Sequence, residues 1–226
     1  MKQTHKLATA MIPNNGGELV LLQREDEFTI KLSGARGVLM NSRVYNSEQE
    51  LAKLGCAHIK NTNGAAVLVG GLGMGYTLAT ALDCVNSSSS VTVAELIPDV
   101  VEWNRGPLGE CAGKPLDDAR SQVRLGDIAE LIKQQKPDFD AILLDVDNGP
   151  EGITNNDNNW LYSTAGLNAL LNSLRPKGML AVWSAAPDSL FITQLKKAGF
   201  KNVTDKMVRA RPGKGSRHII FLAQKP

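Results

Sequence analysis

Cysteine and histidine are scarce in this sequence, which contains three of each. Cys56, Cys84 and Cys111 are odd in number and form no Cys-x-x-Cys pair, so we expect reduced thiols rather than a disulfide framework. The three histidines lack the spacing of zinc ligands. We therefore expect no bound metal.

An excess of one charge and long apolar runs are also lacking. Lys plus Arg number 25 against 23 Asp plus Glu, which gives a formal charge of +2. This balance provides no basic surface of the kind that binds nucleic acid, so we expect no nucleic-acid partner. No apolar run approaches about 18 residues, and residues 1–10 lack the apolar core of a signal peptide. We expect a cytoplasmic protein with no membrane partner.

The 226 residues, 42% of them hydrophobic, suffice for one α/β domain and a small appendage. Residues 1–62 are expected to form this appendage, a small β-unit followed by a linking helix that ends near residue 60. Ser47 and Glu50 have the spacing of a capping box at the start of that helix. The strands of the β-unit are predicted at 18–23, 27–32 and 37–40.

Residues 63–226 alternate between strand and helix patterns, which indicates a parallel sheet with helices on both faces. Strands are predicted at 65–70, 91–95, 121–125, 139–146 and 178–183. Helices are predicted at 75–84, 98–104, 127–134, 163–174 and 187–198. The last two apolar runs, 201–208 and 218–223, have no helix between them and predict an antiparallel hairpin. The expected fold class is α/β, with a Rossmann-like, doubly wound, mostly parallel seven-stranded sheet.

A glycine-rich turn after the first of these strands is the most informative motif. Gly71, Gly73 and Gly75 would let backbone N–H groups approach a ligand, although a tight turn needs glycine even where nothing binds. Glu95 follows at the end of the next strand, 20 residues after Gly75, and could accept hydrogen bonds from a ribose diol. A dinucleotide fingerprint would require Gly or Ala where Tyr76 stands, which disfavours a dehydrogenase.

Three aspartates follow later strands. Asp127 is expected to cap a helix, to meet an adenine amino group, or both. Asp145 and Asp147 point the same way if their strand persists, and together they could hold an amine or accept its proton. The residue types from Asp147 to Pro150 also favour a turn, which would explain Asp147 without a functional role but would not explain Asp145.

Three other features have simpler interpretations. Residues 155–159 form a polar stretch that is either a lid or a solvated loop. Four basic residues in 209–217 either make a solvated turn or contact an acidic group. Trp103 and Trp183 are expected to be core residues rather than rings that stack on a cofactor.

Several segments taken together resemble the spermidine synthase family: 71–78, 93–101, 126–127, 144–150 and 161–163. The resemblance covers nearly the whole chain, and it implies a homodimer that binds S-adenosylmethionine, its decarboxylated form or methylthioadenosine. By the same resemblance the three glycines shape the pocket for the methionine end of the ligand, Glu95 and Leu96 meet the ribose, and Asp127 and Ile128 meet the adenine. Asp145 corresponds to the catalytic aspartate. Asp147, Tyr162 and Arg43 correspond to acceptor-binding positions.

Departures from the family pattern concern the acceptor side. The family carries an aspartate where Met74 stands, and its Tyr-Gln and Gln positions fall at about Ala52-Lys53 and at Arg43. The loss of an acid and the gain of basic residues disfavour a polycationic amine. We therefore expect methyl transfer to a small acceptor, with Asp145 orienting or deprotonating it. Aminopropyl transfer and a nucleoside-binding module without catalysis are the alternatives.

Overall fold

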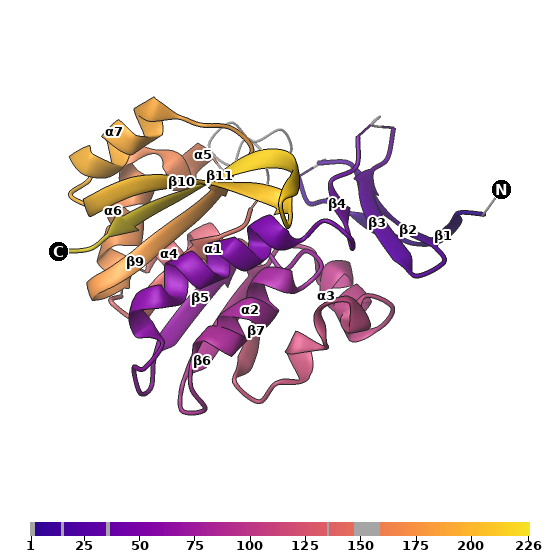
Figure 1. The fold of residues 1–226 in the computed structure, drawn as a ribbon, viewed down its shortest axis with the longest axis horizontal. Coiled ribbons are helices and arrows are strands. Elements are labelled where there is room, and N and C mark those ends of the chain that lie inside the picture. The colour runs from indigo at the N-terminus through magenta and orange to yellow at the C-terminus, as the bar shows by residue number, and fades with distance from the viewer. Residues whose placement is uncertain (1–2, 15, 35–36, 135, 147–158) are drawn as a thin grey trace.

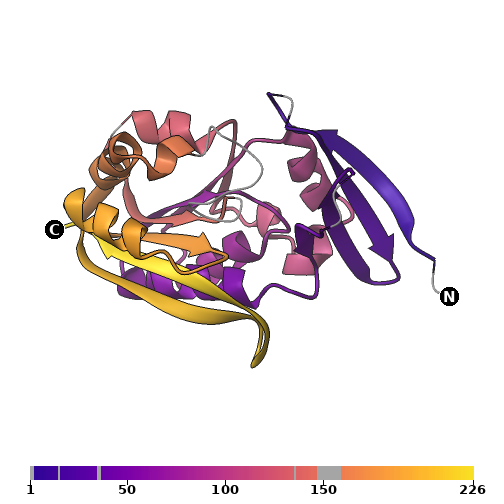
Figure 2. The same ribbon diagram turned by 90° about the horizontal axis from the view of Figure 1, so that it is seen from above.

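The computed structural model describes residues 3–14, 16–34, 37–134, 136–146 and 159–226. It contains a small N-terminal sheet and a larger domain in which helices cover a central sheet (Figure 1). The two chain ends lie at opposite ends of the molecule (Figure 2). Within the described ranges, no helix is long and apolar enough to cross a membrane.

The N-terminal sheet is antiparallel, with its four strands in sequence order. The strands are β1 (His5–Met11), β2 (Glu18–Arg24), β3 (Glu27–Leu32) and β4 (Met40–Asn41). β1 was missed from the sequence because it is an edge strand in which only Ala10 is buried, so it shows no alternation of apolar and polar residues. β2 and β3 were predicted, and β4 is confined to the end of the predicted 37–40 run.

The central sheet has seven strands in the order β10-β11-β9-β8-β5-β6-β7. Five strands are mutually parallel: β5 (Ala66–Gly70), β6 (Ser90–Glu95), β7 (Ser121–Leu125), β8 (Phe139–Leu144) and β9 (Leu174–Ser184). β10 (Lys201–Arg211) and β11 (Lys214–Gln224) form an antiparallel hairpin that pairs with β9. The predicted Rossmann-like fold class, including this C-terminal hairpin, is confirmed.

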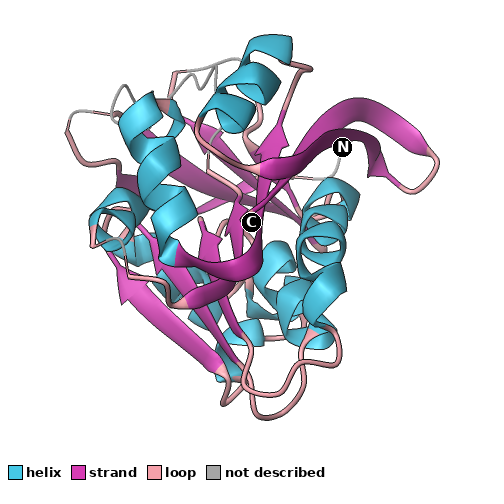
Figure 3. Ribbon diagram, turned by 90° about the vertical axis from the view of Figure 1, so that its left-hand side faces the viewer, coloured by secondary structure: helices cyan, strands magenta, loops and turns pink. Residues whose placement is uncertain are grey.

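Helices lie on both faces of this sheet (Figure 3). One face is covered by α1 (Asn46–Cys56), α2 (Tyr76–Cys84) and α3 (Pro98–Arg105). The other is covered by α4 (Ile128–Lys133), α5 (Asn159–Tyr162), α6 (Thr164–Ser173) and α7 (Ser189–Lys197). The described ranges also contain three short 3-10 helices: η1 (Ala57–Ile59), η2 (Gly109–Ala112) and η3 (Pro115–Asp117).

Two apolar cores follow from the alternation of side chains along the strands. Val67 and Val69 of β5 are fully buried against the helices of the first face. Leu68, between them, is fully buried against the second face. This explains why the sequence of β5 is a continuous apolar run, as expected for a parallel strand that is covered on both sides.

From β5, the chain adds β6 and β7 on one side of the sheet and then returns to add β8 and β9 on the other side. The strand order therefore reverses between β5 and β8, which are neighbours. The Asp145 N–H donates to the Gly70 carbonyl at 2.9 Å, so the segment after β8 stays attached to the end of β5. The Gly71 N–H donates to the Ala94 carbonyl of β6 at 2.9 Å. Open α/β sheets bind ligands at such a reversal, outside the carboxyl ends of the strands.

Helix α1 differs from the prediction at its start. It begins at Asn46, so Ser47 lies inside the helix rather than at its N-cap, and no side chain caps it. The Ser47 hydroxyl donates to the Glu48 carboxylate, and Glu50 pairs with Lys53 at 2.9 Å. The predicted capping box is therefore wrong. α1 packs against α2, β9 and β10 of the larger domain, while the boundary at residue 62 stays a prediction.

Candidate functional site

The glycine loop between β5 and α2 needs glycine at each of its three positions. Gly71, Gly73 and Gly75 have φ of 88°, 54° and 84°, in the left-handed region that other residues rarely adopt. A Cβ atom on Gly71 would collide with the Asp145 carbonyl oxygen, and one on Gly73 would lie 3.1 Å from the Met40 sulfur. A side chain at Gly71 or Gly73 would therefore occupy space that the loop leaves open.

Glu95 holds this loop in place from the end of β6. Its Oε2 accepts the Leu72 N–H and its Oε1 accepts the Ile97 N–H, both at 2.9 Å. The carboxylate is buried, and these two hydrogen bonds to backbone amides offset part of the cost of burying it. Each oxygen has a second lone pair, so Glu95 can also accept from a ribose diol.

Asp127 lies at the corresponding position after β7. Its Oδ1 accepts the Ala129 N–H at 2.8 Å, which confirms the predicted N-cap of α4. Asp127 also lines the main cavity, so one side chain can cap the helix and face a ligand. The two interpretations of this residue are compatible, as expected.

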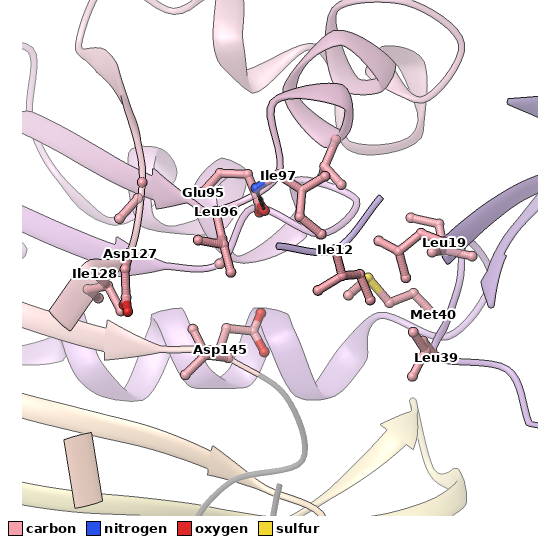
Figure 4. A pocket seen from close by; sticks show the side chains of 17 residues that line it. Ile12, Leu19, Leu39, Met40, Glu95, Leu96, Ile97, Asp127, Ile128 and Asp145 are labelled. Atoms are coloured by element: carbon pink, nitrogen blue, oxygen red, sulfur yellow. Dashed lines mark hydrogen bonds between the residues drawn. The ribbon is translucent and has the colours of Figure 1, made fainter. Parts of the chain in front are cut away.

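The main cavity lies at the carboxyl ends of the strands, where Glu95 and Leu96 face Asp145 across it (Figure 4). Gly71, Gly73, Asp127 and Ile128 also line it. Its opposite wall comes from the N-terminal part of the chain and includes Ile12, Leu19, Leu39 and Met40 (Figure 4). Ile30 of β3 also lines the cavity. This apolar wall could not be predicted from the sequence, because the contact between the two sheets depends on tertiary structure.

A second cavity adjoins the first. The two share Leu39, Met40, Gly73 and Asp145, so Asp145 lies where they meet. The Asp145 carboxylate is held there by the Thr77 hydroxyl of α2, which donates to Oδ2 at 2.6 Å. The second cavity is further lined by Asn41, Val44, Glu48, Leu72, Met74, Tyr76 and Trp183.

Glu48 is the residue of this cavity that the sequence interpretation missed. It lies on the face of α1 that also carries Leu51 and Ala52, three and four residues later, both of which are fully buried. Burial raises the pKa of the Glu48 carboxyl to about 7, and the negative charge of Asp145 adds to this rise. The sequence signal for a buried acid was the spacing of Glu48, three and four residues before two apolar residues of the same helix. We overlooked it because the segment was interpreted as a capping box.

The structure places three of the candidate residues away from both cavities or outside its described ranges. Arg43 is exposed and pairs with Asp26 and Glu27, so its charge is neutralised at the surface. Tyr162 is buried on the other face of the sheet, with its ring 5.6 Å from that of Phe191. Asp147 lies outside the described residues, as does the polar stretch 155–159 except for its last residue, which begins α5.

Two further expectations about side chains change. Lys53, expected near the acceptor, pairs with Glu50 on an exposed side of α1. Trp183 was expected to be a core residue, but it also lines the second cavity, where its ring lies 4.7 Å from that of His218. Trp103 is buried, as expected. Among the residues that the structure describes, no group of three or more His, Cys, Asp or Glu could hold a metal ion.

Comparison with known proteins identifies the family. Residues 46–210 match the family model of the spermine/spermidine synthase domain. The chain belongs to this family. The match begins at the first residue of α1 and ends in β10, so it includes both carboxylates of the second cavity.

Individual relatives agree with this assignment. A polyamine aminopropyltransferase of Sulfolobus acidocaldarius is 29% identical over 143 residues, which cover 61% of this chain and 46% of that protein. The chain thus spans about half the length of this curated relative. Two solved structures share the fold at 18% identity, each covering 98% of this chain and 72% of the other. They are a spermidine synthase in complex with the transition-state analogue AdoDATO (TM-score 0.76) and the spermidine synthase of Thermotoga maritima (TM-score 0.75).

Our prediction of methyl transfer is wrong. The matching family and the curated relative are both named for polyamine synthesis, which agrees with the alternative instead. The prediction assumed that Arg43 and Lys53 make the acceptor side basic, whereas both are paired with acids elsewhere. It also assumed that no acid replaces the one missing at Met74, whereas Glu48 lines the same cavity.

Proposed function

We propose that this protein is a polyamine aminopropyltransferase, which transfers an aminopropyl group from decarboxylated S-adenosylmethionine to an amine. The observation that carries the proposal is the composition of the second cavity. Glu48 and Asp145 line it, and none of its lining residues within the described ranges is Lys, Arg or His. A partly enclosed site with two carboxylates and two aromatic rings, Tyr76 and Trp183, favours a cationic ligand.

The main cavity suits the nucleoside part of the donor. Glu95 would accept from the ribose hydroxyls, Asp127 would meet the adenine amino group, and Leu96 and Ile128 would contact the base and sugar. The glycine loop leaves room for the sulfur and its substituents, because a Cβ on Gly71 or Gly73 would occupy that space.

Asp145 lies at the junction of the cavities, where the two substrates would meet. The amine nitrogen attacks the carbon beside the sulfonium, and the bond between that carbon and sulfur breaks. Much of the rate of such a transfer comes from holding the nucleophile in line with that carbon. The Thr77 hydroxyl fixes the Asp145 carboxylate, which would orient the amine. Asp147 remains a proposed second contact of the amine.

The same two carboxylates bear on the choice of donor. The carboxylate of intact S-adenosylmethionine would extend from the sulfur toward Asp145 and Glu48, and like charges in a partly buried site repel each other. The decarboxylated form carries only an amine at this end. We therefore expect it to bind more tightly than the intact form.

A transfer assay tests the proposal. The protein is incubated with decarboxylated S-adenosylmethionine and putrescine, and methylthioadenosine and spermidine are quantified by chromatography, with intact S-adenosylmethionine in a parallel reaction. We expect both products with the decarboxylated donor only. Tight binding of methylthioadenosine without any transfer to putrescine or other diamines would favour a nucleoside-binding module instead.

Assembly and location belong to the same proposal. We propose a homodimer, which the family resemblance implies and which the edge of the N-terminal sheet could form, and a cytoplasmic location where both substrates are available. Light scattering of the purified protein measures the first point. A monomer at micromolar concentration would contradict it.

A further inference from the structure

A chain of hydrogen bonds leads from the second cavity toward the surface of the molecule. The Ser47 hydroxyl donates to Oε2 of Glu48 at 2.6 Å. The same hydroxyl oxygen lies 3.0 Å from Nδ1 of His218 on β11. Three residues from two elements that are far apart in the sequence are thus connected, with Glu48 at the cavity and His218 at the other end.

Ser47 is almost completely buried, whereas His218 is half-buried. A serine hydroxyl has one proton and two lone pairs, so it can donate in only one direction at a time. When Glu48 is ionised, the hydroxyl donates to Glu48 and accepts from His218. When Glu48 carries a proton, the hydroxyl can turn and donate to Nδ1 of a neutral imidazole. These two arrangements are those that a proton relay requires.

Different groups surround the two ends of the relay. Around Glu48 the titratable groups are Asp145 after β8 and Tyr76 of α2. His218 faces the ring of Trp183 on β9 and pairs across the hairpin with Val208 of β10. The basic side chains beside it on the hairpin, Arg209 and Arg217, are directed to solvent or to the hairpin turn, and Arg209 donates to the Gly215 carbonyl.

His218 connects the buried part of the chain to solvent. The residues before it on the hairpin, 211–217, are all exposed. Burial lowers the pKa of the His218 imidazole, which favours its neutral form near pH 7 and leaves it able to accept a proton.

We propose that Glu48, Ser47 and His218 form a proton-release relay for the acceptor amine. Glu48 accepts the proton from the attacking nitrogen, Ser47 passes it on, and His218 delivers it to solvent. This inference rests on the proposed function, because an amine acceptor supplies the proton.

The proposed transfer releases one proton, so the site needs a path for it. A protonated amine must lose a proton before its nitrogen can attack, and the attack then converts the neutral nitrogen directly into the ammonium group of the new secondary amine, without uptake of a proton. As the carbon–nitrogen bond forms and the carbon–sulfur bond breaks, the electron pair goes to sulfur, which becomes a neutral thioether. One proton per turnover therefore leaves the site. Ser47 and His218 do not line the cavity, so they are positioning and relay residues rather than catalytic ones.

The pH dependence of turnover with decarboxylated S-adenosylmethionine and putrescine tests the relay. In the wild-type protein kcat/KM should rise with pH through an ionisation near 7, which is the pKa of Glu48. Glu48→Gln should abolish this limb and lower kcat by about 10²–10⁴-fold. Ser47→Ala should move the limb to higher pH, because the Ser47 hydrogen bond lowers the pKa of Glu48.

His218→Asn gives the sharpest comparison, because an amide reaches Ser47 much as Nδ1 does but cannot carry a proton. We expect kcat to fall about ten-fold, with KM for putrescine unchanged. The matched control is His5→Asn, on the exposed part of β1, which should leave both constants unchanged. Thermal unfolding of each variant checks folding, and if Ser47→Ala does not fold, His218→Asn decides the question.

A second measurement does not depend on activity. The pKa of His218 is followed by NMR in the wild-type protein and in Glu48→Gln. We expect the His218 resonances of the wild-type protein to show a second inflection near pH 7, where Glu48 ionises, and to lose this inflection in the variant. Wild-type kcat and an unchanged pH profile in both relay variants, or an unchanged His218 titration, would overturn the relay alone. Failure of the wild-type protein to form methylthioadenosine would instead overturn the proposed function.

Discussion

Replacing Glu48 by glutamine should stabilise the protein at alkaline pH and change its stability little at acid pH. The pKa of the carboxyl rises from 4.5 to about 7 on folding, mainly because of burial. Between these two values the folded state binds more protons than the unfolded state, so the wild-type protein loses stability as pH rises from 4.5 to about 7. The difference corresponds to roughly 3 kcal/mol. Glutamine keeps the shape of the side chain and removes its charge.

The assay is urea unfolding of wild type and Glu48→Gln at pH 4 and pH 8, without ligands. At pH 8 we expect the variant to be more stable by up to about 3 kcal/mol, a large part of a typical unfolding free energy of about 5–15 kcal/mol. At pH 4 the difference should nearly vanish. Glu50→Gln on the same helix, which removes only a partly exposed pair with Lys53, should change stability by less than about 1 kcal/mol.

The contribution of Asp145 can be separated in the same experiment. Its charge accounts for part of the raised pKa of Glu48, so Glu48→Gln should stabilise an Asp145→Asn background by less than it stabilises the wild type. Equal stability of wild type and Glu48→Gln at both pH values would refute the reasoning, because it would mean that Glu48 is hydrated in the folded protein.

Three further changes test the rest of the site. Gly71→Ala should destabilise the protein by about 1–3 kcal/mol and abolish nucleoside binding, because the added methyl group meets the Asp145 carbonyl. The control is Gly64→Ala, where φ is also positive (+64°) but no atom lies within 4 Å of the added methyl group, so its thermal unfolding measures the backbone cost alone. Glu95→Gln should weaken methylthioadenosine binding by about 10–100-fold in calorimetry, because an amide N–H group then faces the Leu72 N–H or the ligand; equal affinity would exclude the ribose role. Asp145→Asn should lower turnover by about 10²–10⁴-fold while methylthioadenosine affinity changes little, and turnover at the wild-type rate would make this residue structural.

The central sheet could be predicted because its local signals agree. β5 and most of β8 are apolar, and glycine or aspartate follows β5, β7 and β8. Errors lie where neighbours from elsewhere in the chain decide the conformation. β9 begins at Leu174 rather than at 178, since its first residues pair with Phe139 of β8. β8 ends at Leu144, so the strand geometry assumed for Asp145 does not persist.

The nucleoside side of the candidate site was easier to foresee than the acceptor side. Gly71, Glu95 and Asp127 each follow a strand, so sequence spacing alone brings them to one edge of the sheet. Glu48 reaches the site from a helix on the sheet face, and Arg43 is drawn away by acids on the N-terminal sheet. Neither of these placements can be predicted from the neighbouring sequence. Together they make the acceptor side acidic, whereas we expected it to be basic.

The N-terminal part of the chain and the larger sheet contribute different kinds of side chain to the main cavity. The charged groups that face the ligand come from the ends of the larger sheet, whereas Ile12, Leu19 and Ile30 supply shape and no charge. A change of volume at these three positions would alter which donor fits without disturbing the strands that hold the carboxylates. For the proposed transfer, we therefore expect donor selectivity to vary independently of the carboxylates at the strand ends.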